Sequence, residues 1–250
     1  MAAADLATAG RDTDADWRQL GATEPYWGVL SHPDFRTENI TPEKVEEFYR
    51  SGPFHIGPIA EDLKALTGAY PSGRALDFGC GVGRLAEAMT AYADQVTGLD
   101  ISPGMLALAR ARGSKVTYVD TLPAGPFDWI NSFIVFQHIP PDRGLAILKD
   151  LLDRLALGGV ISLQLTAWRD ENRKWPEETG LRKVFQKQRQ VRWLLNLPVG
   201  HIHMYDYDLS RVLRLVNQAG IEEMKLVSTN HDGHHGVIIL GRKTAEPYQS

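Results

Sequence analysis

The sequence predicts an α/β fold, a doubly wound and mostly parallel sheet with helices on both faces. Short apolar runs that end in an acidic residue alternate with stretches whose apolar residues recur every three or four positions. This alternation is typical of strands joined by crossover helices. A glycine-rich turn follows the first such strand. The 250 residues, 43% of them hydrophobic, are enough for one large domain with a small cap.

Composition narrows the classes of function. The formal net charge of −4 gives no overall positive field, so we expect neither a nucleic-acid partner nor a membrane partner. The one cysteine, Cys80, excludes an internal disulfide framework and fits a reducing cytoplasm. We expect no membrane span, because no run of about eighteen apolar residues occurs. The Ala- and Asp-rich start lacks the basic and apolar regions of a signal peptide.

The stretch before the first strand is mostly helical. We expect residues 1–14, which are small and acidic, to be disordered. Residues 15–69 are expected to form a helical cap whose last helix ends at Gly68. Tyr26 and Trp27 lie beside a turn in this cap. They are either core residues of the cap or part of an acceptor pocket, and both interpretations stay open.

The first strand and its turn carry the most informative motif. The pattern D-x-G-x-G-x-G is matched by Asp77, Gly79, Gly81 and Gly83. Such glycines let a ligand approach the main chain closely, and the helix that follows offers unpaired N–H groups. The dinucleotide pattern G-x-G-x-x-G fits less well. If the pattern starts at Gly79, its last position, which should hold a small residue, is Arg84. If it starts at Gly81, the pattern gives no role to Asp77.

At this motif the chain resembles the class I S-adenosylmethionine (SAM)-dependent methyltransferases. The resemblance covers roughly residues 70–165 by motif and 205–242 by pattern. It implies a Rossmann-like seven-stranded sheet with an antiparallel last strand, within a domain at residues 70–242. It also implies that Asp77 and the glycine loop hold the methionine part and ribose of SAM. In the family, a leader like this one folds over the cofactor and acceptor pocket.

Two further acids end the next strands. Asp100 ends the strand that starts at Val96, and it lies 17 residues beyond Gly83. A carboxylate there can accept hydrogen bonds from both ribose hydroxyls, and we assign the neighbouring Ile101 to the same pocket. The alternative is a helix-cap acid, although the following Ser is the better cap. Asp120 ends the third strand. With Thr121 it resembles the family residues near the adenine amino group.

The fourth strand and its exit, Phe127 to Phe136, are apolar enough to be central. Methyltransferases of exocyclic amines often carry N-P-P-Y or D-P-P-Y here, but this chain matches only Asn131. This departure disfavours methylation of nucleobase amines. By the resemblance, Ser132 and Phe133 border the cofactor. His138 follows near the methyl end, where it is either a general base, since its ordinary pKa is near 6.5, or a residue that shapes the pocket.

The rest of the domain continues the alternation. A helix from Pro141 is expected to end at Gly158-Gly159, before a fifth strand over 160–165, and this arrangement resembles a later family motif. A helix ended by Gly220 and two last strands, 224–227 and 236–240, complete the sheet. Between these strands, residues 231–235 hold three histidines and an aspartate. They are typical of an exposed hairpin turn rather than a metal site, and we expect no bound metal.

Residues 168–200 interrupt the alternation. Between Trp168 and Trp193, eight Lys and Arg residues face four acids, a local net charge of +4. An apolar stripe predicts an inserted lid helix, and its charge favours an anionic group on the acceptor; a solvated basic face is the alternative. His201, His203 and Tyr205 follow on the same edge of the sheet. We take His203 as a second candidate base and the other two as candidate acceptor ligands.

The resemblance implies SAM-dependent methyl transfer to a small molecule, and we favour O-methylation over N-methylation. The sulfonium methyl is already activated, so the protein mainly aligns the reactants. A base is needed only if the acceptor holds its proton tightly. Two alternatives remain, a nicotinamide-dependent oxidoreductase, which Arg84 disfavours, and a non-catalytic SAM-binding partner protein. The sequence leaves the acceptor and the oligomeric state open.

Overall fold

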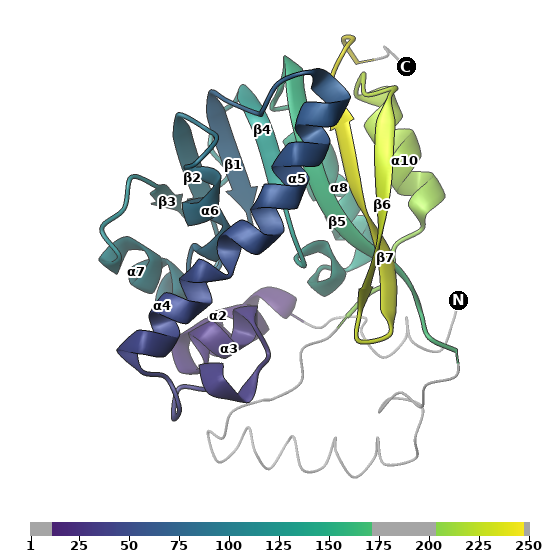
Figure 1. The fold of residues 1–250 in the computed structure, drawn as a ribbon. Helices are drawn as coiled ribbons and strands as arrows, with labels where there is room; N and C mark the ends of the chain where they lie inside the picture. Colours follow the sequence, from purple (N-terminus) through teal and green to yellow (C-terminus); the bar gives the residue numbers. More distant parts are fainter. Residues whose placement is uncertain (1–11, 172–203, 248–250) are drawn as a thin grey trace.

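The computed structural model describes residues 12–171 and 204–247 and contains one seven-stranded sheet (Figure 1). The strand order is β3-β2-β1-β4-β5-β7-β6. β7 is antiparallel to both of its neighbours, and the other pairs are parallel. The predicted fold class is therefore confirmed. The strands are β1 Arg74–Phe78, β2 Gln95–Leu99, β3 Thr117–Val119, β4 Phe127–Ser132, β5 Leu155–Arg169, β6 Met224–His231 and β7 His234–Arg242.

Helices cover both faces of the sheet (Figure 1). One core cluster joins α5 and α6 to one face, and another joins α8 and α10 to the opposite face. α2 and α3 lie below the carboxyl ends of the parallel strands (Figure 1). The helices are α2 Thr13–Thr23, α3 Pro25–Val29, α4 Pro42–Arg50, α5 Gly52–Thr67, α6 Arg84–Met89, α7 Pro103–Ala111, α8 Pro141–Leu152 and α10 Leu209–Gln218, with short 3-10 helices at Pro33–Phe35 and Phe136–His138.

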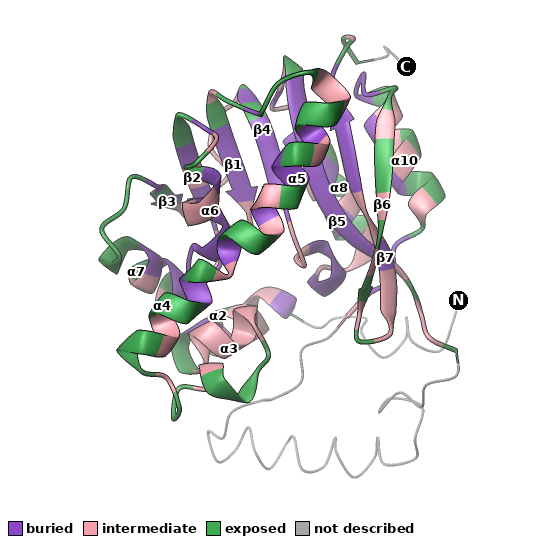
Figure 2. Cartoon of the chain, viewed as in Figure 1, coloured by how far each residue is buried: buried purple, intermediate pink, exposed green. Residues whose placement is uncertain are grey.

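The central position predicted for the fourth strand is confirmed. β4 pairs with β1 on one side and β5 on the other. Trp129 and Ile130 are fully buried in opposite core clusters, as alternating side chains of a doubly covered strand must be (Figure 2). This strand therefore ties the two layers of helices together at the middle of the sheet.

The expected end of the helix before β5 is wrong. α8 ends at Leu152, and β5 already begins at Leu155 and runs through the glycine pair. Gly158 does adopt the left-handed φ of +83° that favours glycine, but it does so inside the sheet, where its N–H donates to Lys243. The glycine signal therefore marks an irregularity in a strand rather than a helix end.

The first helix starts inside the segment expected to be disordered. Asp12 caps α2 by accepting hydrogen bonds from the N–H groups of Asp14 and Ala15, both at 3.0 Å. Residues 1–11 lie outside the described residues. α2 also packs closely on α7, since a Cβ added at Gly104 would lie 2.6 Å from the carbonyl oxygen of Gly21. The helical cap is thus packed against the sheet domain through its first helix.

The expected hairpin joins the last two strands, but its turn is shorter than predicted. Only Asp232 and Gly233 separate β6 from β7, with φ of 53° and 86°, as a two-residue type I′ turn requires. His231 and His234 are therefore strand residues and pair with each other. Of the predicted insertion at 168–200, residues 172–200 lie outside the described part. Among the helices that the structure describes, none is long and apolar enough to cross a membrane.

Candidate functional site

The glycine loop lies between β1 and α6. Gly79, Gly81 and Gly83 have φ of 76°, 56° and 89°, which other residues rarely adopt. The N–H groups of Gly79 and Cys80 donate to the carbonyl of Leu99 at 2.8 and 2.9 Å, so the loop is fastened to β2. A Cβ at Gly81 would lie 2.8 Å from Val29 of α3. The glycines thus permit both the turn and the close packing of the cap.

A buried chain of hydrogen bonds orients Asp77. Trp129 donates to Ser162 Oγ at 2.9 Å, Ser162 donates to Asn131 Oδ1 at 2.7 Å, and Asn131 donates to Asp77 Oδ1 at 2.8 Å. Asp77 is 2% exposed, and its Oδ2 has no hydrogen-bond partner in the described chain. Burial raises the pKa of this carboxyl to about 7, against the opposing effects of Asn131 and Arg84. Its second oxygen is thus available to a donor in the pocket.

Arg84 fastens the loop to the helical cap. Its guanidinium donates to Ser51 Oγ at 3.2 Å and to His55 Nδ1 at 3.1 Å, at the start of α5. It is 3% exposed. Burial lowers its pKa to about 10, partly offset by the charge of Asp77, so the side chain stays protonated at neutral pH. The arginine that breaks the dinucleotide pattern therefore has a structural task in this chain.

Asp100 joins the loop to the next helix. Its Oδ2 accepts the N–H of Gly81 and its Oδ1 accepts the N–H of Ser102, both at 2.8 Å. Burial raises the pKa of Asp100, and these N–H bonds oppose the shift. Ser102 itself caps α7 by accepting the N–H of Met105 at 3.5 Å. Asp100 is thus held in place at the pocket wall, with lone pairs left on both oxygens for a ligand's hydroxyls.

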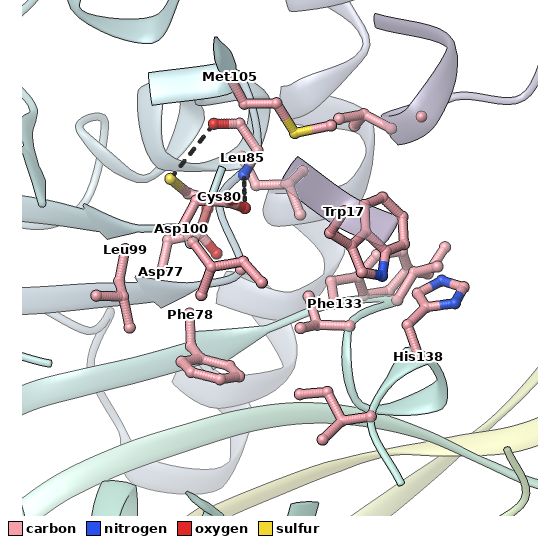
Figure 3. A pocket seen from close by; sticks show the side chains of 18 of the residues that line it. Trp17, Asp77, Phe78, Cys80, Leu85, Leu99, Asp100, Met105, Phe133 and His138 are labelled. Atoms are coloured by element: carbon pink, nitrogen blue, oxygen red, sulfur yellow. Dashed lines mark hydrogen bonds between the residues drawn. The ribbon is translucent and has the colours of Figure 1, made fainter. Parts of the chain in front are cut away.

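These groups surround one cavity with about 1140 Å³ of empty space, part of it open to solvent. The loop and strand ends form one wall, and the cap forms the other. Figure 3 shows Asp77 and Asp100 at one end and Trp17 and His138 at the other. Besides the acids and the loop, the lining includes Thr13, Asp14, Trp17, Val29, Ile101, Met105, Phe133, His138 and Arg143.

Trp17, Phe133 and His138 close the aromatic end of the pocket (Figure 3). The ring centroids of Trp17 and His138 are 4.9 Å apart. Gln137 accepts a hydrogen bond from Thr166 at 2.8 Å through Oε1, so its amide nitrogen faces His138 Nε2 at 3.3 Å. An amide nitrogen only donates, which favours the neutral imidazole with its proton on Nδ1. In this tautomer the other ring nitrogen, Nδ1, carries a proton and has no lone pair.

The structure brings seven of the residues predicted from the sequence to this cavity. They are Asp77, Gly79, Gly81, Asp100, Ile101, Phe133 and His138. Gly83 precedes α6 as its N-cap residue, next to the cavity wall. Ser132 is fully buried at the end of β4, and its hydroxyl has no partner among the residues described.

Other predicted residues lie away from the cavity. Asp120 and Thr121 are exposed after β3, and neither lines it. Tyr26 packs edge-on against Phe48 in the core of the cap, and Trp27 lies under the guanidinium of Arg36, 3.6 Å from its ring centroid. Tyr205 belongs to the core cluster beneath α8 and α10. His201 and His203 lie outside the described residues.

Sequence reasoning missed the contribution of the first helix. Arg143 of α8 makes two hydrogen bonds of 2.7 Å to the carboxylate of Asp14, and both side chains line the cavity. Thr13 and Trp17 line it as well. The capping signal at Asp12 would have started a helix here, but no local signal announces an ion pair to a residue so distant in the chain.

Comparisons with known proteins agree with this geometry. Residues 75–159 match the family model of a methyltransferase domain. A ubiquinone biosynthesis O-methyltransferase of Xanthomonas campestris pv. campestris is 33% identical over 123 residues, which are 44% of this chain and 51% of the relative. The enzyme with the same name from Idiomarina loihiensis is 26% identical over 76% of this chain and 83% of its own length. The chain thus spans about half the length of the first relative.

One solved structure extends the likeness over the fold. It is a magnesium protoporphyrin IX methyltransferase from Synechocystis PCC 6803 with bound S-adenosylhomocysteine. The TM-score is 0.58 at 16% identity, and the match covers 92% of this chain and 99% of that one. At this identity, the comparison supports the arrangement of strands and helices alone.

Proposed function

Because the chain contains a methyltransferase domain of the class I, SAM-dependent family, we propose that it transfers a methyl group from SAM to a hydroxyl of a small molecule. The observation that carries the proposal is the placement of two carboxylates, the buried Asp77 and the half-buried Asp100, on either side of the glycine loop in one cavity. The two sit at the carboxyl ends of adjacent parallel strands, where ligands of open α/β sheets bind.

Each carboxylate has a distinct task. Asp100 accepts the ribose hydroxyls while its bonds to Gly81 and Ser102 keep it in place. Asp77 accepts the cationic amino group of the cofactor through Oδ2, the oxygen that the described chain leaves without a partner. The aromatic end of the pocket excludes water from the reaction. When bound, SAM supplies a methyl group on a positively charged sulfur, already activated for displacement.

The named relatives support oxygen as the acceptor atom. The two described above are called O-methyltransferases. The basic segment after Trp168 still predicts an anionic acceptor, and its main part lies outside the described residues. A cytoplasmic location likewise stays a prediction from the sequence.

A nicotinamide oxidoreductase fits this site less well. In a dinucleotide site the third small residue lets helix and strand pack closely. Here that position is Arg84, whose guanidinium is buried and bonded to the start of α5.

Ligand-dependent melting tests the proposal. A ligand that binds only the folded state raises the melting temperature by mass action. We expect S-adenosylhomocysteine and SAM to raise it and NAD to leave it unchanged, and equal shifts from NAD would contradict the proposal. Incubation with methyl-labelled SAM and pools of small hydroxylated molecules then measures methyl incorporation. Cofactor binding without incorporation into any pool would favour the non-catalytic partner protein.

A further inference from the structure

A second group of polar side chains lies on the face of the sheet that α5 covers. Ser162 of β5 bonds to Trp129, which shares a core cluster with α5, so Gln164 two residues later faces the same way. Ile238 of β7 and Val227 of β6 pack against that cluster and pair with each other. Two and four residues beyond Val227, Thr229 and His231 therefore share this face as well.

Three of these side chains carry an unsatisfied polar atom. Gln164 Nε2, Thr229 Oγ1 and His231 Nε2 are buried and have no hydrogen-bond partner within residues 12–171 and 204–247. Leaving one buried polar group unpaired costs about 1–3 kcal/mol, and native proteins rarely leave several together. Unpaired groups on one face, next to a proposed active site, indicate that a ligand completes their hydrogen bonds.

Phe133 connects this group to the cofactor pocket. Its ring lines the cavity beside Trp17 and His138 (Figure 3). It also contacts two histidines edge-on, His55 at a centroid distance of 5.3 Å and His231 at 5.8 Å. Gln164 lies directly behind the cavity wall, because its Oε1 accepts the N–H of Ile134 at 3.0 Å, and Ile134 lines the cavity.

Strand direction brings His231 to the edge of the sheet where the cofactor loop lies. It is the last residue of β6 and pairs with His234, which pairs with Arg169 at the end of β5. The hairpin therefore projects beyond the carboxyl ends of the parallel strands, toward α2 and α3 (Figure 1). Sequence reasoning placed these histidines in an exposed turn. The structure instead places His231 against Phe133, half-buried.

The surroundings keep His231 neutral. Burial and the nearby His55 lower its pKa. Burial and the charge of Arg84 lower that of His55. Other charged or titratable groups near the hairpin end are Asp232 in the turn, His234 and His235 in β7, and Asp170, whose N–H donates to the carbonyl of Gly233. Arg169 is also nearby, and its guanidinium is paired with Asp206 at 3.3 Å. A neutral imidazole is the form that accepts a proton.

We propose that His231 receives the hydroxyl proton of the acceptor and that the acceptor is a phenol lying against Phe133. The proposal rests on the methyl-transfer function above. In the reaction, the acceptor oxygen bonds to the transferred carbon while the carbon–sulfur bond breaks. The electron pair of that bond stays on sulfur, and the hydroxyl proton moves to His231 Nε2. Gln164 Nε2 donates a hydrogen bond that orients the acceptor.

The chemistry of the site selects a phenol. Flat rings pack well against Phe133 and Trp17 in edge-on or offset arrangements. A phenolic hydroxyl has a pKa of about 10, as tyrosine does, so a histidine can assist its ionisation as the bond to carbon forms. The proton of a simple alcohol is held far more tightly, and a neutral imidazole would remove it poorly.

The test uses the full chain with S-adenosylhomocysteine bound and 4-nitrocatechol, a phenol whose absorbance changes when its hydroxyl ionises. Titration of the wild-type complex should show saturable binding with an ionisation signal. His231→Gln keeps the size and polarity of the side chain but cannot take the proton. We expect it to weaken probe binding by about tenfold or more and to abolish the ionisation signal.

His235→Gln is the matched control, because His235 pairs with Asn230 and so lies on the opposite face of the same hairpin. It should behave as wild type. All variants should bind S-adenosylhomocysteine with wild-type affinity in calorimetry, since His231 does not line the cofactor cavity. If His231→Gln fails to fold, His231→Asn takes its place.

Two results would overturn the proposal while leaving the cofactor site intact. One is a wild-type complex that binds S-adenosylhomocysteine but neither binds nor ionises the probe. The other is His231→Gln matching His235→Gln in both signals. Failure of the wild type to bind S-adenosylhomocysteine would instead reject the proposed function itself. With a phenol that is methylated, His231→Gln should lower kcat by roughly 10²–10⁴ and remove the acidic limb of the pH profile, with KM for SAM unchanged.

Discussion

Asp77 and Asp100 end neighbouring strands, but the protein holds them in different ways. Asp77 receives one side-chain hydrogen bond and keeps a buried oxygen without a partner in the described chain. Asp100 receives a main-chain N–H on each oxygen. The first carboxyl is therefore the more sensitive to protonation, and the second is the more important for the shape of the loop.

The raised pKa of Asp77, about 7, predicts that cofactor binding releases a proton. Below that pH the empty site holds the carboxyl neutral, and a cationic amino group favours the charged form. Affinity for S-adenosylhomocysteine should thus rise between about pH 6 and 8. Calorimetry in two buffers of different ionisation enthalpy measures the released proton. Asp77→Asn should remove this proton release, and an unchanged release in that variant would assign it to another group.

The same shift affects stability without ligand. The folded state holds the proton of Asp77 up to about pH 7, whereas the unfolded chain loses it near pH 4. The folded state therefore binds more protons in this window, and the contribution to the free energy of unfolding is full below about pH 4 and is lost as the pH rises through 7. Urea unfolding from pH 4 to 8 should show a flatter profile for Asp77→Asn than for wild type.

Asp100→Ala should weaken S-adenosylhomocysteine binding by about 1.5–3 kcal/mol, because it removes hydrogen bonds to a charged group. Asp120→Ala is the matched control, since this acid ends the next strand but is exposed and does not line the cavity. Calorimetry measures both affinities. A folded Asp100→Ala variant with wild-type affinity would show that Asp100 does not bind the ribose.

At the scale of single elements, α2 is a helix that the local sequence alone does not predict. Acidic, small residues at the start of the chain suggest disorder, yet Asp12 caps a helix and Asp14 pairs with Arg143. The glycine pair inside β5 misleads in the same way, because a left-handed glycine occurs at a strand irregularity as well as at a helix end. In both places the secondary structure depends on contacts with residues distant in the chain, and not on the local sequence alone.

The ion pair between Asp14 and Arg143 should strengthen cofactor binding. It holds α2 over the cavity, but it is partly exposed, so we expect Asp14→Ala and Arg143→Ala each to weaken S-adenosylhomocysteine binding by only about 0.2–1 kcal/mol. The double variant should lose little more than either single one. The pair of Lys149 and Asp153, also on α8, is an exposed control away from the cavity. If removing the control pair weakens S-adenosylhomocysteine binding equally, the effect comes from the change in charge and not from the ion pair that holds α2 over the cavity.

At the scale of the whole molecule, the fold class followed from a simple regularity. Acids after apolar runs and glycines after the first acid marked the carboxyl edge of the sheet, so Asp77, Asp100 and the loop could be placed from sequence. Side chains that reach the cavity from elsewhere could not. Trp17 reaches the cavity from the cap, whereas His231 lies outside its lining and contacts Phe133 because β6 pairs with β7. Neither position carries a periodic signal, because each depends on packing between distant elements.

Cap and sheet should unfold as one unit. Tyr49 of α4 donates a buried 2.7 Å hydrogen bond to the carbonyl of Val82 in the glycine loop, and Phe48 packs beside it in the same cluster. Tyr49→Phe should lower the free energy of unfolding by about 0.5–1.5 kcal/mol and keep a single transition. Circular dichroism and tryptophan fluorescence, followed together in urea, test this. Two separated transitions in the wild type would mean that the cap folds independently.

The cap also bears on the timing of the reaction cycle. Thr13, Asp14, Trp17 and Val29 form one wall of the cavity, so a spent cofactor is enclosed between the cap and the glycine loop. We predict that its departure requires this wall to move, so that the slowest event of each turnover is an opening rather than a bond change. Such an enzyme has the same maximal turnover rate with acceptors of different reactivity, as long as methyl transfer is faster than the opening. Acceptors of increasing reactivity should therefore converge on a common maximal rate, and loosening the wall with Asp14→Ala should raise that shared ceiling.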